Sequence, residues 1–114
     1  MDESKYENAL QIILHAGNAK SSALMAIDAA AEGDFEEADR LLAESQSEMG
    51  EAHKMQFALT QAEANGNPVD INIILIHAED HLTMAIMAAD MAERMIDLYR
   101  EVKAKYCLLY TSPS

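Results

Sequence analysis

Apolar and small residues recur at a helical period along most of the chain, and two turn signals divide the pattern into three long helices. Ser4-Lys5-Tyr6-Glu7 has the composition of a capping box, which predicts that the first helix begins there. Glu32-Gly33 predicts its end, since glycine adopts the left-handed conformation that closes many helices. The predicted inward positions of this helix are Tyr6, Leu10, Ile13, Gly17, Leu24, Ile27 and Ala31.

The next segment is also predicted to be a helix with a cap at its start and a breaker at its end. Asp34 predicts the cap of a second helix, with Glu37 at the matching position of a capping box. The run Asn65-Gly66-Asn67-Pro68 is a strong helix breaker and predicts its end. Its apolar stripe consists of Phe35, Ala38, Leu41, Leu42, Met49, Ala52, Met55, Leu59 and Ala62.

The helix predicted over 70–105, with Asp70 as its cap, carries two apolar stripes, whereas an ordinary amphipathic helix carries one. The first stripe consists of Ile71, Ile74, Leu75, Ala78, Leu82, Ala85, Ala89, Ala92 and Ile96. The second stripe lies on roughly the opposite side and consists of Ile73, Ile76, Met84, Met87, Met91 and Leu98.

These patterns predict an all-α protein, an antiparallel three-helix bundle with short turns. Two helices can cover the first stripe of helix 70–105, but the second stripe would remain exposed as a patch of a size that monomers rarely tolerate. Its positions fit a heptad through His77, Asp80, Met84, Met87, Met91, Arg94 and Leu98. We therefore expect this helix to pack against copies of itself around an axis, as a homo-oligomer. The alternative, that the Met-rich stripe is core beneath a longer loop, is less favoured because no long loop is present.

Composition supports this prediction and excludes some functions. The chain has 114 residues, which favours one domain, and 4 Gly, 2 Pro and no Trp, which favours helices. With 8 Lys and Arg against 20 Asp and Glu, its net charge of −12 opposes binding to nucleic acid or anionic lipid. The sequence shows neither a leader pattern nor an apolar run long enough for a span, so a cytoplasmic location is expected. The single cysteine, Cys107, allows no intramolecular disulfide.

Candidate chemistry lies in the second stripe, at His77, Asp80 and His81, whose i, i+3 and i+4 spacing places them on one surface while Glu79 points elsewhere. A plain hydrogen-bonded network is the usual explanation of such spacing, but polar groups in an apolar seam are costly unless they are satisfied. Around a symmetry axis, copies of Asp80 would converge and repel unless a cation intervened. Oxygen ligands favour Mg²⁺ or a similar hard divalent cation. A three-ligand Zn²⁺ site made by His77, Asp80 and His81 is the alternative.

Three further features carry weaker signals. His53 and Gln56 stand one helical turn apart, where they could orient a phosphate or simply occupy a polar face. His15 is interpreted as a solvated residue. Gly17, inside a helix, suggests a close helix contact, because mid-helix glycine costs about 1 kcal/mol relative to alanine.

Several ordered motifs together resemble one known family. They are Leu14-His15-Ala16-Gly17-Asn18-Ala19-Lys20-Ser21, Glu32-Gly33-Asp34-Phe35, Glu51-Ala52-His53-Lys54-Met55-Gln56 and His77-Ala78-Glu79-Asp80-His81-Leu82. Over roughly residues 6–104 the chain resembles the IIA component of the lactose/cellobiose-type (N,N'-diacetylchitobiose-type) sugar phosphotransferase system. The resemblance implies a homotrimer of three-helix protomers, which relays a phosphoryl group from the phosphocarrier protein HPr to a cysteine of the cognate IIB component.

The same resemblance implies residue roles. His77 would be the phosphorylated histidine, Asp80 the ligand whose three copies hold a metal ion on the trimer axis, and His53, Gln56 and His81 residues of the active cleft. Glu79 stands where the family usually has Gln, and Phe57 stands where it often has Thr. The transported sugar stays open, since the membrane component binds it in that family.

The alternative function is a non-enzymatic helical adaptor or metal-binding bundle whose Met-rich seam binds a partner helix. Residues 1–106 are expected to form the domain. Residues 107–114, Cys107-Leu108-Leu109-Tyr110-Thr111-Ser112-Pro113-Ser114, resemble the translation of a transposon-end adapter used in sequencing libraries and are expected to be a non-native tail. The alternative is a natural tail that docks Leu108 and Leu109 on the bundle.

Overall fold

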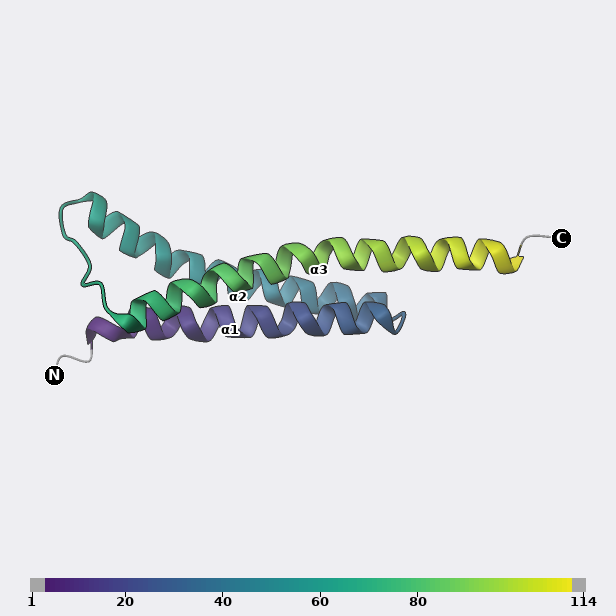
Figure 1. The fold of residues 1–114 in the computed structure, drawn as a ribbon, viewed down its shortest axis with the longest axis horizontal. Coiled ribbons are helices and arrows are strands. Elements are labelled where there is room, and N and C mark those ends of the chain that lie inside the picture. Colours follow the sequence, from purple (N-terminus) through teal and green to yellow (C-terminus); the bar gives the residue numbers. More distant parts are fainter. Residues whose placement is uncertain (1–3, 112–114) are drawn as a thin grey trace.

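The computed structural model describes residues 4–111 of the chain, with side chains described over 6–107. It consists of three helices, α1 (Ser4–Ala31), α2 (Phe35–Ala64) and α3 (Ile73–Thr111), and the described residues contain no strand. Consecutive helices run antiparallel in a rod of 72 × 24 × 19 Å, so that α1 and α3 point the same way (Figure 1). α1 packs along both other helices, whereas α2 and α3 touch each other much less, because the second half of α2 diverges from the bundle. The predicted all-α three-helix architecture is confirmed.

Both predicted helix stops are glycine-based motifs of the same kind. Gly33 has a φ of 84° and Gly66 a φ of 82°, in the left-handed region that side chains with a Cβ disfavour. The N–H group of the following residue then donates to a carbonyl five residues back, from Asp34 to Ala29 and from Asn67 to Ala62, each at 2.9 Å. These bonds satisfy carbonyls that the helix itself cannot satisfy.

The helix starts agree with the prediction at α2 and differ at α3. Asp34 caps α2 as predicted, since its Oδ1 accepts from the Glu37 N–H at 3.1 Å. The predicted cap at Asp70 is wrong, because α3 begins at Ile73 and the Oδ1 of Asn72 accepts from the Leu75 N–H at 2.9 Å. The chain needs the extra residues to return from the divergent end of α2 to α1 (Figure 1).

The start of α1 and the end of α3 concern two further predictions, the capping box at Ser4 and the helix end near Lys105. α1 is described from Ser4 onward, and the predicted capping role of the Ser4 side chain lies outside the described side chains. α3 continues to Thr111 rather than stopping near Lys105, since no glycine or proline interrupts it before Pro113. Cys107 is exposed on this helix. The non-native origin of 107–114 stays a prediction, and residues 112–114 lie outside the described range.

The inward face of α1 differs from the prediction. It is a ladder of small residues around Ile12, namely Ala9, Ala16, Ala19, Ser22, Ala23, Ala26, Ala29 and Ala30. Leu10 and Leu24, predicted to face inward, are about half exposed, and Ala31 is exposed. The helical period is confirmed, but the buried face is built from alanine, because α1 packs against two helices and small side chains permit closer approach. A Cβ added at Gly17 would meet nothing within 4 Å, so the predicted close contact there does not occur within this chain.

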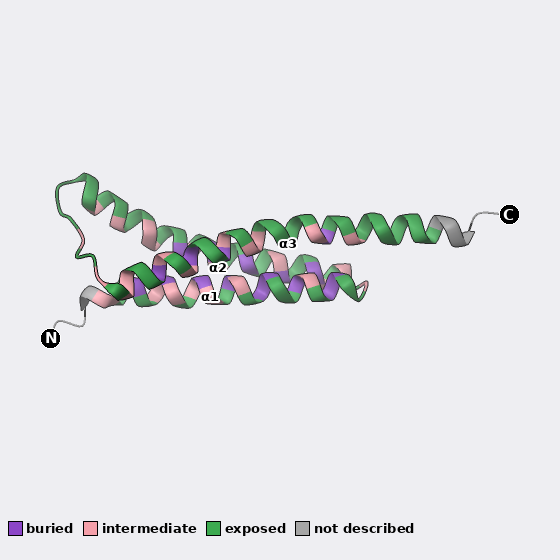
Figure 2. Cartoon of the chain, in the orientation of Figure 1, coloured by how far each residue is buried: buried purple, intermediate pink, exposed green. Residues whose placement is uncertain are grey.

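The predicted faces of α2 and α3 are largely confirmed. Every member of the predicted α2 stripe is buried or half-buried. On α3 the first stripe supplies the buried residues Ala78, Leu82, Ala85, Ala92 and Ile96 (Figure 2). Its first predicted member, Ile71, is 78% exposed because it precedes the helix.

Polar contacts fix the helices against one another. The buried Ser45 hydroxyl of α2 donates to the Ala19 carbonyl of α1 at 2.7 Å. His15, expected to be solvated, is instead half-buried, with its Nδ1 2.7 Å from the Glu48 carboxylate. These contacts hold the middle of α1 to α2.

The far end of the bundle is held by a cluster around Phe35. Arg100 and Lys103 of α3 each place their charge 5.2 Å from the centre of the Phe35 ring, and Arg100 also pairs with Asp39 at 2.5 Å. Cation–π contacts and the ion pair therefore attach α3 to the start of α2. In residues 4–111, no helix combines the length and apolarity needed to cross a bilayer.

Replacing Ser45 tests the contact between α1 and α2. Ser45→Ala is expected to lower the free energy of unfolding by about 0.5–1.5 kcal/mol, because it removes a buried interhelical hydrogen bond. Denaturant unfolding measures the loss. Ser47→Ala is the matched control, since Ser47 is exposed on the same helix and its replacement should change stability by less than about 0.5 kcal/mol. Equal effects of the two substitutions would contradict the assignment.

Candidate functional site

The second stripe of α3 is bare in the single chain, as the sequence predicted. All six members are exposed, from 47% for Met91 to 77% for Ile73, and the full set is Ile73, Ile76, Met84, Met87, Met91 and Leu98. Four large apolar residues of α1 are also exposed, namely Leu10, Leu14, Leu24 and Met25. This α1 contribution was not predicted, since Leu10 and Leu24 keep the helical period that predicts an inward face.

His77 and Asp80 lie together near the start of the bare stripe. With Ile76 they line a cavity of about 410 Å³ between α1 and α3, whose α1 side is formed by Leu10 and Ile13. Both polar side chains are exposed. The i, i+3 spacing thus places an imidazole and a carboxylate in one apolar recess, as predicted.

The imidazole of His81 joins this group through His77. The two Nε2 atoms are 3.0 Å apart, and the rings meet edge to face with their centres 4.4 Å apart and an interplanar angle of 80°. In such a pair one Nε2 carries the proton and the other accepts it. If His81 donates, the Nε2 of His77 is unprotonated, and the lone pair that accepts this hydrogen bond can attack once the bond breaks.

The three-ligand Zn²⁺ alternative is wrong for one chain. Within the described residues, no group of three His, Cys, Asp or Glu side chains is placed to hold a metal ion. The two imidazoles of the cluster turn toward each other. A metal site at Asp80 would therefore take its donors from more than one chain.

Glu79 and Gln56 form a second contact, on the side of α3 that faces α2. With the Gln56 amide oriented so that its nitrogen faces the carboxylate, it donates to both Glu79 oxygens, at 3.1 Å to Oε2. Partial burial raises the pKa of the Glu79 carboxyl above its usual value, because burial disfavours the charged form. Glu79 points away from His77, as predicted, but nothing in the local sequence indicated Gln56 as its partner.

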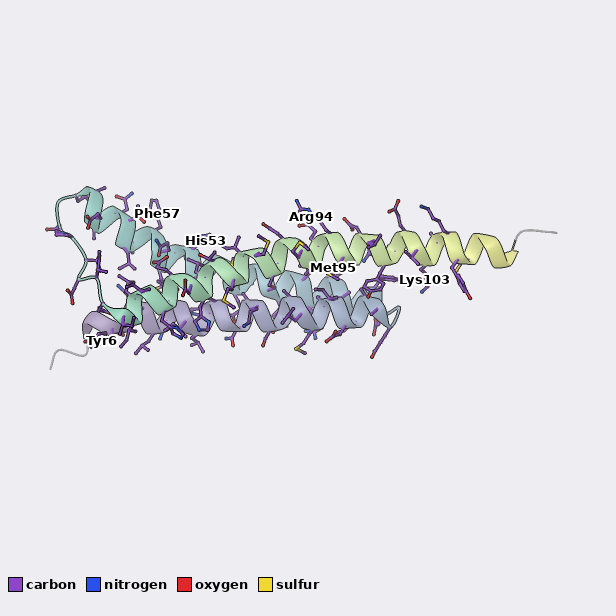
Figure 3. All side chains as sticks on the ribbon, in the orientation of Figure 1. Tyr6, His53, Phe57, Arg94, Met95 and Lys103 are labelled. Carbon is purple, nitrogen blue, oxygen red and sulfur yellow. The ribbon has the colours of Figure 1, made fainter. Side chains whose placement is uncertain are left out.

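His53 lies in a separate groove between α2 and α3. This groove has a volume of about 250 Å³, and its lining includes Gly50 of α2 and Asp90 and Glu93 of α3. Figure 3 shows His53 along the upper edge of the molecule. Within one chain the fold therefore does not gather His53 and Gln56 with His77 and His81, although all four were predicted to line one cleft.

Sequence comparison identifies related proteins over most of the chain. Residues 7–100 match the family model for "PTS system, Lactose/Cellobiose specific IIA subunit". The chain is 42% identical over 102 residues to the lichenan-specific phosphotransferase enzyme IIA component of Bacillus subtilis, covering 90% of this chain and 93% of that protein. It is 34% identical to a lactose-specific EIIA component of Streptococcus mutans, covering 79% of this chain and 86% of that protein.

Solved structures show the same fold. The cellobiose-specific enzyme IIA of Bacillus anthracis is 39% identical and superposes with a TM-score of 0.89, covering 92% of this chain and 96% of that one. The chitobiose IIA of Escherichia coli, solved in complex with HPr, is 28% identical with a TM-score of 0.75, covering 87% of this chain and 96% of that one.

The imidazole pair can be tested by its ring nitrogen signals. His81→Ala is expected to shift the ¹⁵N signals of the His77 ring, because it removes the group bonded to Nε2. Long-range ¹H–¹⁵N spectra measure the shift. His15→Gln is the control, since His15 lies on the α2 side of α1, and it should leave the His77 signals in place. Unchanged His77 signals in His81→Ala would show that the pair does not form in solution.

Proposed function

Because this chain belongs to the lactose/cellobiose-specific IIA subunits of the sugar phosphotransferase system and so takes part in its phosphoryl relay, we propose that His77 is the residue that carries the phosphoryl group. It would accept the group from phosphorylated HPr and pass it to a cysteine of the cognate IIB component. The exposed His77 imidazole, bonded to His81 in a recess, carries this proposal. The HPr complex of the E. coli chitobiose IIA supports HPr as the donor.

The transfer requires positioning rather than acid–base chemistry. The unprotonated His77 Nε2 attacks phosphorus in line as the N–P bond of the donor phosphohistidine breaks, and the electron pair of that bond returns to the donor nitrogen. In the second step the IIB thiolate attacks phosphorus, and the N–P bond to His77 breaks in the same way. A phosphoryl group brings about −1.5 to −2 charges. His81 is placed to donate a hydrogen bond to it.

We propose that the chain works as a homotrimer packed through the bare stripe of α3. His77 and His81 lie on the flank of the stripe that faces α1, whereas Glu79 and its partner Gln56 lie on the flank that faces α2. Around a threefold axis, one flank of each copy meets the other flank of its neighbour. His53 and Gln56 of one copy would thereby line the cleft of the neighbour's His77, which accounts for their separation within a single chain.

Asp80 is proposed to hold a divalent cation on the trimer axis. Its carboxylate is exposed on the apolar face, and three copies would supply only oxygen donors, which fit Mg²⁺ or a similar hard cation. The cation would neutralise the converging carboxylates. The relay is proposed to operate in the cytoplasm.

Replacing His77 tests the relay directly. His77→Ala is expected to abolish labelling by phosphorylated HPr, because no nucleophile remains, while the helicity stays that of the wild type. Radiolabel transfer and circular dichroism measure the two outcomes. His15→Gln should keep full labelling, since His15 lies between α1 and α2. Persistent labelling of His77→Ala would assign the phosphoryl group to another residue.

Replacing Asp80 tests the metal separately. Asp80→Leu is expected to keep the trimer, because it replaces converging charges with apolar side chains in an apolar seam, but to lose the bound cation. Sedimentation measures the assembly, and elemental analysis of the purified protein measures the metal. Equal metal content in Asp80→Leu and wild type would place the ion elsewhere, and a metal-free wild type would remove the proposed site.

A further inference from the structure

Phe57 is an unexplained apolar residue outside the α3 stripe. α2 is described along its whole length, and Phe57 is its only large apolar side chain that is exposed, at 62%. The other large apolar residues of α2, namely Phe35, Leu41, Leu42, Met49, Met55 and Leu59, are buried or half-buried. Aromatic side chains, Phe included, are enriched in protein–protein interfaces relative to the rest of the surface.

Phe57 borders the residues assigned to the relay. It follows Gln56 directly and lies one helical turn after His53, so His53 and Phe57 occupy one face of α2. Figure 3 shows both side chains along the upper edge of the molecule, at the end where α2 turns toward α3. A donor that brings its phosphorylated imidazole to this cleft must also cover the surface around it.

The same face leaves room for a partner. Gly50 lies two turns before Phe57 and lines the groove of His53. A Cβ at Gly50 would meet nothing within 4 Å, so no packing within the chain requires a glycine there. Since mid-helix glycine costs about 1 kcal/mol relative to alanine, a partner that approaches the helix backbone gives a reason for it.

The charge around Phe57 indicates which kind of partner surface would bind there. Glu63 lines a pocket with Gln56, and the basic Lys54 is paired with Glu51 at 3.2 Å. Asp90 and Glu93 add acidic groups beside His53. A partner surface with Lys or Arg around an apolar patch complements this charge.

We propose that Phe57 is the apolar anchor of the surface on which the phosphoryl-donor protein docks, and that the donor contributes an apolar patch bordered by basic residues. This inference rests on the proposed relay through His77.

The test measures phosphoryl transfer from phosphorylated HPr to the full chain at increasing HPr concentration. Phe57→Thr is expected to raise the half-saturating HPr concentration about tenfold and to leave the maximal rate unchanged, because Phe57 touches the donor but not the reacting atoms. Val102→Thr is the matched control. It makes an exposed apolar side chain polar at the opposite end of the molecule and should keep the wild-type values.

Each of the remaining outcomes would contradict a different part of the two proposals. An unchanged half-saturating concentration in Phe57→Thr, with normal labelling of the wild type, would overturn the docking proposal alone. A Phe57→Thr protein whose mass in solution differs from the wild type would show that a second copy covers this face, and a defect confined to transfer toward IIB would assign it to the acceptor. Absence of any labelling of the wild type would overturn both the relay and the docking proposal.

Discussion

The organisation of this protein depends on the two opposed apolar stripes of α3. The alanine face of α1 packs closely on one stripe together with α2, and a bundle of three helices has no fourth element for the other. The six exposed residues of the second stripe, with the exposed residues of α1, form an apolar surface that water disfavours. The proposed trimer would cover this surface, and it would also place His77 and Asp80 at an interface.

The same constraint explains why the proposed site is divided within one chain. His77 and His81 turn toward α1, and Gln56 meets Glu79 on the side of α2. A relay protein benefits from such a division, because a phosphoryl group must be held by surrounding donors without being enclosed. The acidic groups beside His53, Asp90 and Glu93, would then favour the docking of partners of opposite charge.

Much of the fold could be predicted because its signals are local. The glycines at 33 and 66 and the cap at Asp34 close and open helices through contacts within a few residues. The errors arose where a distant element decided the outcome. The cap of α3 is Asn72 and not Asp70, because the chain must first return from the divergent end of α2. Leu10 and Leu24 were taken as core because the sequence does not show that α1 lies between two helices.

For the site, the sequence by itself determined which side chains share one face of a helix. It grouped His77, Asp80 and His81 on one face and separated Glu79 from them, because positions three and four apart meet on any helix. Only the tertiary structure decided which helices those faces meet. It paired Gln56 with Glu79 and His15 with Glu48, and it placed His53 in another groove, because contacts between helices depend on their relative rotation and separation, which no local pattern encodes.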